Sequence, residues 1–535
     1  MTAFFFIFCS LFLSFSFVPY ITSSPPCPAL PAAAYSFAQV YNSSSPEFST
    51  TQKLDWNQAL SYSPCAVLSI PSIGALQSLL PLLSSSPAAS CPWNVRSGRH
   101  SYEGLSSSPN SLVLDVSSLR TLSFHSEAQP QQRQQEDRTQ KRTASISTIV
   151  KVGPGVCMME LYSFLLDHRF IFPGGTCPTV GVHGYVLGGG FGFLSRRMGL
   201  GADNLVAAKV VLANGTLVSC SPKERPDLFF ALRGGGNGNF GVVVELQLRV
   251  WPLPSSPRSL PSGKRKDGGF QHVSLSWGRN ETVPVLARWQ RWAPFADTRL
   301  TSQLNVYEGN VGVIAQWMAD DEKELQQELK RLLVGLSPQP TEFQVKKMSA
   351  AEAIVEYAGC STAEECLAQC MERPSSETKN RLAWKSKSIF ASRFLEDAEI
   401  EELVSWMRER EKVRPCCKGQ FAGFMLDAFG GAIAKVPVKE TAFPHRDALF
   451  LMQLMGYWNI NDNPQAAENQ AATLEWLQGA YATATKLLSP LKAYRNYDDR
   501  DLAANYMDAY YGPNARALAV VKQKYDPEDP TNNRE

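Results

Sequence analysis

The sequence predicts an α+β protein with two large parts. Up to residue 252, short apolar runs bounded by Gly, Ser and Pro alternate with runs at helical spacing. Glycine-rich loops become frequent from residue 174 onward. Beyond residue 253, runs that alternate between apolar and polar residues are followed by amphipathic segments. This second pattern predicts an antiparallel sheet covered by helices.

The elements of the first part follow one another along the chain. "CAVLSIPSIGALQSLLPLL" predicts a short strand, a break and a helix, and "CMMELYSFLLDH" predicts a second helix. "WNVRSG", "SLVLDVSSL" and "STIVKVGPG" are typical of short strands. In "NLVAAKVVLANGTLVSC" the pair Asn214-Gly215 predicts a hairpin. A long strand over "VVVELQLRV" then closes a domain that we place at 55–252.

The second part contains three alternating runs, "HVSLSW", "TSQLNVYEG" and "VGVIAQWM", which predict strands of one sheet. "DEKELQQELKRLLVGL" and "EDAEIEELVSWMREREK" predict helices that cover it. We place this domain at 253–463, and a further helix, "AAENQAATLEWLQGAYATATKLL", begins the C-terminal segment 464–535.

The composition is that of a globular protein, with 44% apolar and 19% charged residues. The 52 basic and 50 acidic side chains nearly cancel, so no nucleic-acid partner is expected. The apolar N-terminus, followed by small residues and prolines, predicts a signal peptide over 1–23; a signal anchor is the alternative interpretation. An N-terminal segment, 24–54, would follow it.

Secretion is also favoured by three sequons, at Asn42, Asn214 and Asn280. With no later apolar run long enough to span a bilayer, we expect an extracellular protein without a membrane partner once the signal is cleaved. Twelve cysteines include Cys9 in the predicted signal, so eleven remain in the mature chain. In an oxidising compartment an odd number leaves one sulfur without a disulfide partner.

Several familiar sites are not supported by the spacing of their residues. "GGGNGNFG" is followed by a strand-like run, whereas a dinucleotide fingerprint requires a helix there. Cysteines and histidines lack zinc spacing, so no metal is expected, and the GxSxG motif of serine hydrolases does not occur. By contrast, "RSGRHSYEGLS" offers consecutive backbone N–H groups in a loop of Gly and Ser, a composition suited to holding an anion.

Five motifs in order resemble the berberine-bridge-enzyme-like flavoprotein oxidases. They are "RSGRHSYEGLSS", "GGTCPTVGVHGYVLGGGFG", "ALRGGGNGNFGVVVELQL", "AFPHRDALFLMQ" and "AYRNYDDRDL". The resemblance implies a fungal-type secreted member with a two-part FAD-binding domain of the PCMH type, a substrate domain, and a C-terminal segment that returns to the FAD domain. It covers 55–252 and 421–530 closely, and the region between them only in its broad pattern.

The resemblance also implies FAD held by two covalent bonds, from His100 to the flavin 8α-methyl group and from Cys177 to flavin C6. This would account for the unpaired sulfur, and family analogy pairs Cys27 with Cys91 in a disulfide. The other residues placed at the cofactor are Arg96, Ser97, Gly98, Arg99, Ser101, Val180, Gly181, Gly189, Phe191, Gly241, Val243 and Asn496.

For catalysis, the resemblance implies Tyr497 as the base over the flavin. Such a base needs a lowered pKa, through positive charge or hydrogen bonding. Gln453 would orient or hydrogen-bond, because an amide is not a general base, and Tyr102 would line the substrate pocket. Phe191 stands where some alcohol-oxidising relatives have an assisting tyrosine, which puts a two-tyrosine mechanism in doubt.

Two further departures from the family pattern concern the cofactor loops. Arg99 replaces the second glycine of the RSGGH pattern and brings a charge that is available to phosphate. His183 stands where glycine is usual.

The leading hypothesis is a secreted oxidase that moves a hydride from a C–H bond of an alcohol, amine or phenolic natural product to FAD, with O2 as acceptor and H2O2 as product. Val180, three residues beyond Cys177, stands where relatives that react with O2 carry valine or a smaller residue. One alternative is a carbohydrate oxidase that forms a lactone. Another, from a different class, is a flavin-carrying binding protein without catalysis.

Overall fold

The fold is described by a computed structural model. It covers residues 29–48, 55–60, 62–85, 91–125, 148–236, 238–259, 265–267, 269–307, 310–371, 383–413, 422–458 and 465–527. The predicted signal peptide and Cys27 lie outside these residues. Within them, no helix is both long enough and apolar enough to cross a lipid bilayer.

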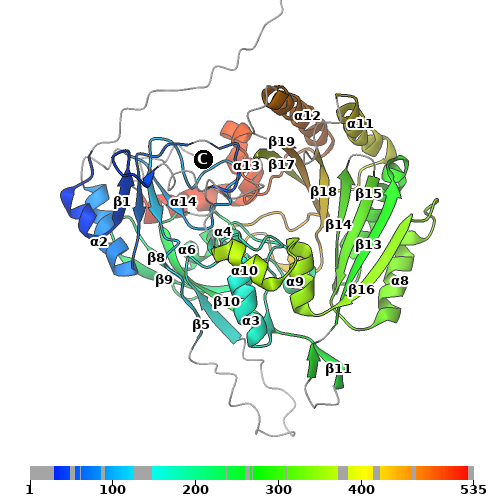
Figure 1. Ribbon diagram of the computed structural model, residues 1–535, viewed down its shortest axis with the longest axis horizontal. Coiled ribbons are helices and arrows are strands. Elements are labelled where there is room, and N and C mark those ends of the chain that lie inside the picture. Colours follow the sequence, from blue (N-terminus) through cyan, green and yellow to red (C-terminus); the bar gives the residue numbers. More distant parts are fainter. Residues whose placement is uncertain are drawn as a thin grey trace, which may run out of the picture.

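The N-terminal sheet of four strands has the order β1-β2-β4-β3, with β2 parallel to β4 and β4 parallel to β3. Helix α2 (Ile73–Ser84) packs its apolar face on this sheet (Figure 1). The helix starts at Ser72, whose hydroxyl accepts a hydrogen bond from the Ala75 amide at 3.1 Å, as an N-cap should. The strands are β1 (Gln39–Asn42), β2 (Ala66–Ser69), β3 (Trp93–Arg96) and β4 (Leu112–Asp115).

A second sheet carries the strand order β5-β6-β10-β8-β9, with the short β7 paired to β10. The hairpin predicted around Asn214-Gly215 is confirmed, since β8 and β9 pair antiparallel across it. Helices α3, α6, α13 and α14 share one core with this sheet. The strands are β5 (Leu122–Phe124), β6 (Thr148–Val152), β7 (Phe170–Ile171), β8 (Leu205–Val211), β9 (Leu217–Cys220) and β10 (Val242–Pro252).

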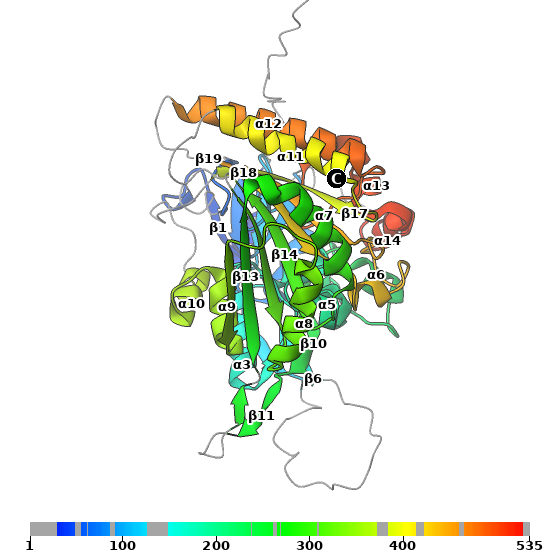
Figure 2. The ribbon, with the colours of Figure 1, turned by 90° about the vertical axis from the view of Figure 1, so that its right-hand side faces the viewer.

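The third sheet is antiparallel, as the three alternating runs predict, and it has seven strands in the order β16-β13-β15-β14-β18-β19-β17. Its apolar face packs on helices α7, α8, α11 and α12, which lie together on one side in Figures 1 and 2. The strands are β13 (Phe270–Gly278), β14 (Leu300–Tyr307), β15 (Asn310–Trp317), β16 (Glu342–Met348), β17 (Ala383–Ala391), β18 (Ala422–Ala428) and β19 (Phe450–Trp458).

Alternation along these strands divides the sheet into two chemically different faces. On β14, Leu304 and Val306 belong to the helix-covered core, whereas Gln303 points to the other face. On β19, Met452 and Leu454 are in the same core, and Gln453 lies between them on the opposite side. The face of the sheet opposite these helices therefore presents polar side chains such as Gln303 and Gln453 toward the N-terminal part, and α9 packs on its β13 edge.

The helices that complete the fold are α3 (Met158–Asp167), α4 (Val182–Leu187), α5 (Ser195–Met198), α6 (Pro226–Ala231), α7 (Thr282–Trp292), α8 (Glu322–Leu333), α9 (Ala350–Ala358), α10 (Ala363–Met371), α11 (Asp397–Val413), α12 (Gln465–Leu487), α13 (Tyr506–Tyr511) and α14 (Ala515–Tyr525). A small separate ribbon joins β11 (Ser255–Ser259) to β12 (Arg265–Asp267).

Arg196 on α5 connects the two parts. Its guanidinium is buried and donates hydrogen bonds to five backbone carbonyls of the second part. Because a buried cation is costly unless its donors are satisfied, this arrangement fixes the loops at the ends of β14 and β18. The accepting carbonyls belong to Pro294, Ala296, Asp297, Leu300 and Phe429.

The C-terminal segment first covers the seven-stranded sheet, since α12 packs against β19 and β17. The chain then turns back and places the 498 position against the N-terminal part. Asp498 accepts hydrogen bonds from the Ser101 hydroxyl at 2.6 Å and from the Tyr102 amide at 2.9 Å. Asp499 pairs with Lys387 at 2.8 Å. The end of the chain thus joins both parts.

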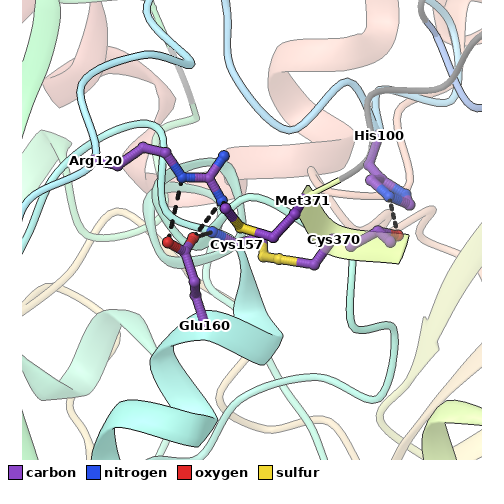
Figure 3. Close-up of a disulfide and its surroundings, with 7 residues drawn as sticks. His100, Arg120, Cys157, Glu160, Cys370 and Met371 are labelled. Carbon is purple, nitrogen blue, oxygen red and sulfur yellow. Dashed lines mark hydrogen bonds and ion pairs between the residues drawn. A yellow bond between two sulfur atoms is a disulfide. The ribbon is translucent and has the colours of Figure 1, made fainter. Parts of the chain in front are cut away.

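The helix pair α9–α10 contains one local disulfide and is tied to α3 by a second. Cys360 bonds Cys366, and Cys370 bonds Cys157 at the start of α3. Figure 3 shows the second of these beside the ion pair of Arg120 and Glu160. Among the described residues, Cys157, Glu160 and Cys370 form the one grouping of potential metal ligands, and its two sulfurs are already joined in this disulfide.

Cysteine parity predicted one unpaired sulfur, and this prediction is wrong. Both Cys177 and Cys220 are free thiols among the described residues, the second fully buried. Counting sulfurs cannot separate an inert core cysteine from a reactive one. Cys91 is disulfide-bonded, as is Cys65, but the predicted partner Cys27 lies outside the described residues.

Candidate cofactor and active site

A cavity of about 1560 Å³ separates the polar face of the seven-stranded sheet from the N-terminal part. This volume exceeds the ~300–1,000 Å³ of ordinary small-molecule pockets. It extends from β14 and β18 at one end to α14 at the other. The residues predicted for the site that line it are Ser97, Gly98, Arg99, His100, Ser101, Tyr102, Cys177, Val180, Gly181, Phe191, Asn496 and Tyr497.

The loop that follows β3 is fixed from below by a buried charge cluster. Asp115 at the end of β4 pairs with Arg96 at 3.0 Å and with Arg99 at 2.7 Å. Burial alone would raise the pKa of Asp115, but the two guanidiniums and the Ser117 hydroxyl outweigh it and lower that pKa. Asp115 is therefore a carboxylate whose charge the arginines neutralise.

Arg99 adopts a left-handed backbone conformation, with φ of 61°. This is the region that glycine reaches without strain, which explains why the family pattern has glycine at this position. A non-glycine residue there costs roughly 1–3 kcal/mol, offset here by the ion pair with Asp115. The ion pair with Asp115 engages Nη2 of Arg99, and its buried Nε has no partner among the described residues.

The histidine loop and the cysteine loop touch each other. A Cβ atom added to Gly98 would lie 2.3 Å from the Gly181 nitrogen, so only glycine permits this approach. His100 Nε2 forms a 2.8 Å hydrogen bond with the Thr179 hydroxyl, two residues beyond Cys177. The two residues predicted to attach the flavin thus sit on loops in direct contact, although they are 77 positions apart in the sequence.

The two predicted attachment residues both face the cavity, and burial acts on both of their pKa values. Burial lowers the pKa of His100 to about 3, so its imidazole is neutral and keeps a nucleophilic lone pair. The ring stacks on Trp56, with centroids 5.2 Å apart. Protein surrounds the Cys177 thiol and raises its pKa, yet the residue is exposed toward the cavity. Its sulfur is therefore reachable from the cavity.

Tyr497 and Tyr102 form a parallel pair in the cavity wall. Their rings are stacked with centroids 5.3 Å apart and an interplanar angle of 6°. Phe191 meets Tyr497 edge-on at 6.0 Å, with no hydroxyl to assist it. Burial raises the pKa of Tyr497 well above 10, and neighbouring Tyr102 and Asp427 raise it further. The lowering that a tyrosine base needs is thus not provided by the described protein groups.

Asp427 on β18 is a site residue that the sequence did not reveal. It lines the cavity and accepts a 2.8 Å hydrogen bond from Gln303 on β14. Burial raises the pKa of Asp427 to about 7, and the Gln303 amide offsets this only in part. An acid with a pKa near neutrality beside Tyr497 is suited to proton transfer. No local motif marks Asp427; only strand pairing brings it to the cavity.

Of the remaining predicted site residues, only Asn496 lines the cavity, and the others lie behind its wall. Gln453 is buried behind Tyr102, donating to its hydroxyl at 3.3 Å and to Ser386 at 3.0 Å. Asn496 does line the cavity, and its amide donates to the Tyr185 carbonyl at 2.9 Å. Arg96, Gly189, Gly241 and Val243 are likewise absent from the lining.

The contacts of these four residues are with other parts of the protein and not with the cavity. Arg96 is held by Asp115, and Val243 pairs with Val210 inside the second sheet. Gly189 and Gly241 have positive φ values of 118° and 114° and pack against neighbouring protein atoms. Glycine is needed there for the backbone. His183 is also buried, with Nε2 2.9 Å from the Val152 carbonyl.

The far end of the cavity is suited to the remainder of a dinucleotide. Gly236 and Gly238 have positive φ and line it together with Asn94, whose buried Oδ1 has no partner among the described residues. Lys522 of α14 also lines it, hydrogen-bonded to the Asn239 carbonyl at 2.7 Å and paired with Asp526 at 2.8 Å. Glycine backbone suits close approach of phosphates, and the Asn94 acceptor suits an N–H donor of a base.

The predicted glycosylation sites lie away from this cavity. Asn214 and Asn280 are exposed, and Asn42 is half-buried with its Oδ1 bonded to the Ser44 amide at 3.0 Å. Glycosylation at these positions stays a prediction.

Two family models match the chain. One, described as an FAD binding domain, covers residues 76–221, and the other, described as berberine and berberine like, covers 493–532. The first includes both contacting loops and the second includes Asn496 and Tyr497. The matches therefore coincide with the two chain segments that meet at Asp498.

Whole-chain relatives agree with these matches. The FAD-linked oxidoreductase YvdP of Bacillus subtilis, itself uncharacterised, is 32% identical over 82% of this chain and 85% of its own. The structure of BBE-like 1 from Physcomitrella patens superposes with a TM-score of 0.77 at 25% identity, covering 94% and 97% of the two chains. A variant of Phl p 4 described as a glucose oxidase has a TM-score of 0.74 at 25% identity, covering 92% and 94%.

Proposed function

The chain belongs to the berberine-bridge-enzyme-like family of FAD-linked oxidoreductases, and from this premise we propose a secreted oxidase with bicovalently bound FAD. The observation that carries the proposal is the contact between the His100 loop and the Cys177 loop at a cavity of about 1560 Å³. Two nucleophilic side chains open onto one cavity, beside a tyrosine pair and a titratable carboxyl. When bound, FAD would supply the hydride acceptor.

His100 and Cys177 would hold the flavin. The neutral imidazole of His100 is oriented by Thr179 at Nε2, which leaves Nδ1 for the bond. Cys177 approaches from the neighbouring loop and is the free thiol that reaches the cavity, whereas Cys220 is sealed in the core. Attachment at two points would keep the cofactor bound outside the cell and fix it against the tyrosine pair.

Tyr497 and Asp427 would move the substrate's proton. The pKa of Tyr497 is raised, so at neutral pH its hydroxyl keeps its proton and is suited to relaying one. Asp427, with a pKa of about 7, is the acceptor on this wall that is partly ionised at neutral pH. We assign Tyr497 to contact with the substrate O–H or N–H and Asp427 to final uptake of its proton. Tyr102, stacked on Tyr497, would fix the ring.

Covalent attachment is tested by denaturation and substrate screening. The purified protein should be yellow, acid precipitation should leave the colour in the pellet, and peptide mapping should find both His100 and Cys177 modified. His100→Ala or Cys177→Ala alone should retain one bond, and the double variant should release all FAD. Complete release of FAD from the wild type would contradict the proposal.

A carbohydrate oxidase is the second candidate, favoured by aromatic side chains that line the cavity at the tyrosine pair. They are Tyr102, Phe191, Tyr494 and Tyr497. Flat aromatic surfaces suit the C–H faces of sugar rings, and the related Phl p 4 variant is described as a glucose oxidase. Under anaerobic conditions, bleaching by oligosaccharides supports this candidate, whereas bleaching by alcohols or alkaloid-like amines supports the first.

The same screen tests the alternative of another class. A protein that keeps its covalent flavin but is bleached by no member of the panel, while dithionite reduces it normally, would be a flavin-carrying binding protein. The titratable Asp427 beside Tyr497 argues for catalysis, because burying such a carboxyl has no evident structural purpose.

A further inference from the structure

A second, smaller cavity lies behind the Cys177 loop. It measures about 60 Å³, is partly open, and is lined by residues of α3, α9, the start of β13 and residues 174–176. Its lining is dominated by apolar side chains. They are Leu165, Leu166, Phe170, Ile171, Phe172, Phe193, Leu194, Phe270, Ala350, Ala353 and Ile354, with Tyr162, Thr176, Gln316 and Tyr357 as the polar members.

The hydroxyl groups of the two tyrosines in this wall are already engaged. Tyr162 donates to the Gly175 carbonyl at 2.6 Å. Tyr357 donates to the Ala315 carbonyl at 3.0 Å and is 2.9 Å from His272 Nδ1. A buried water typically needs about 2–4 polar partners, and cavities lined by aliphatic and aromatic groups stay dry and take up xenon. This cavity therefore favours a small apolar molecule over water.

The small cavity borders the large one through a thin wall. Gly175, Thr176 and Phe193 line both cavities, and Thr176 precedes Cys177. Phe193 stacks on Tyr357, with ring centroids 4.1 Å apart. Gly174 lines only the small cavity, and the Tyr162 hydroxyl packs against it, because an added Cβ would lie 2.2 Å from that oxygen.

We propose that this small cavity is a dioxygen-binding site that supplies O2 to the large cavity. The inference rests on the proposed oxidase function, in which O2 is the co-reactant. O2 is small, apolar and uncharged, which matches the volume and the wall. Each O2 would take up the two electrons and two protons that the substrate gives up and leave as H2O2. Val180 lines only the large cavity, so this supply is separate from any effect of Val180.

The experiment uses the holoenzyme and a matched pair of leucine substitutions on α9. Ala353 is 4% exposed and lines the small cavity, whereas Ala351 on the same helix is exposed. Crystals of the wild type, Ala353→Leu and Ala351→Leu are pressurised with xenon. In parallel, each protein is reduced with dithionite and mixed with oxygenated buffer in a stopped-flow instrument. Neither reaction requires the substrate.

We expect xenon in the cavity of the wild type and of Ala351→Leu, and none in Ala353→Leu. Reoxidation should slow at least about fivefold in Ala353→Leu only. Absence of xenon from the wild-type cavity, or unchanged reoxidation in Ala353→Leu, would overturn the proposal. Slow reoxidation of the wild type would instead reject the oxidase function. If Ala353→Leu does not fold, Ile354→Phe fills the same cavity and replaces it.

Discussion

The loops that carry His100 and Cys177 and the polar face of the seven-stranded sheet form opposite walls of one cavity, yet they are encoded differently. The first wall consists of short consecutive motifs, which contain Gly98, His100 and Cys177. The second consists of alternate residues on separate strands, such as Gln303 and Asp427, which meet only through pairing in the sheet. The residues predicted for the cofactor can therefore be found in local sequence motifs, whereas residues on the sheet wall, such as Asp427, can be found only from the fold.

Replacing the tyrosine between the two walls should give the largest effect. Tyr497→Phe keeps the ring stacked on Tyr102 but removes the hydroxyl, so flavin reduction should slow by roughly 10²–10⁴. Stopped-flow bleaching with the best substrate of the panel measures this, and the flavin spectrum controls for intact attachment. An unaltered rate from pH 6 to 9 would assign proton transfer elsewhere, with Tyr102 as the next candidate.

The stability of the loop after β3 should depend on the buried ion pairs of Asp115 with Arg96 and Arg99. Asp115→Asn removes the anion that Arg96 and Arg99 share, and breaking a buried pair in this way costs about 3–5 kcal/mol in unfolding free energy. Urea unfolding measures the loss. Asp447→Asn is the matched control, because it removes a largely exposed pair with Lys492 worth about 0–1 kcal/mol. Equal losses of unfolding free energy in the two variants would show that the cluster does not stabilise the loop more than an exposed ion pair would.

A substitution at Val180, in the same wall, should change the rate of reoxidation by O2 by a smaller factor. Val180→Leu adds one methylene group beside the flavin loops, and we expect reoxidation by O2 to slow about tenfold, or ~1.4 kcal/mol of barrier. Reduction under anaerobic conditions serves as the control and should not change. A wild type that reoxidises slowly would indicate a dehydrogenase with another electron acceptor.

The polar face of the seven-stranded sheet should make the stability of the protein depend on pH, because it carries Asp427. Burial raises the pKa of Asp427 from 3.8 to about 7, so the folded state favours its protonated form. Stability from this group is present below about pH 4 and is lost as pH rises through 7. Asp427→Asn, which resembles the protonated acid, should therefore melt at a higher temperature than the wild type at pH 8 and at a similar temperature at pH 4. If Asp427 takes up the substrate's proton, the rate of flavin reduction in the wild type should rise as pH increases through 7. This rise should be absent in Asp427→Asn.

Much of the architecture was predictable, because hydrophobic periodicity determines strands and helices locally. The hairpin at Asn214-Gly215 and the antiparallel sheet of the second part, here the seven-stranded sheet, are confirmed. Arg196 was not predictable, since its five carbonyl partners come from loops about 100 residues or more away. Sulfur parity failed for a similar reason: Cys220 is inert only because the fold buries it.

The hydrogen bonds of Asp498 have a consequence for how the protein is made. Ser101, next to His100, is held by a carboxylate 397 residues later in the chain. At roughly 5–20 residues per second, a ribosome needs on the order of 20–80 s to synthesise that interval. The loop that carries His100 is thus completed only after Asp498 has been synthesised. If His100 attaches the flavin as proposed, chains that stop before Asp498 would stay colourless.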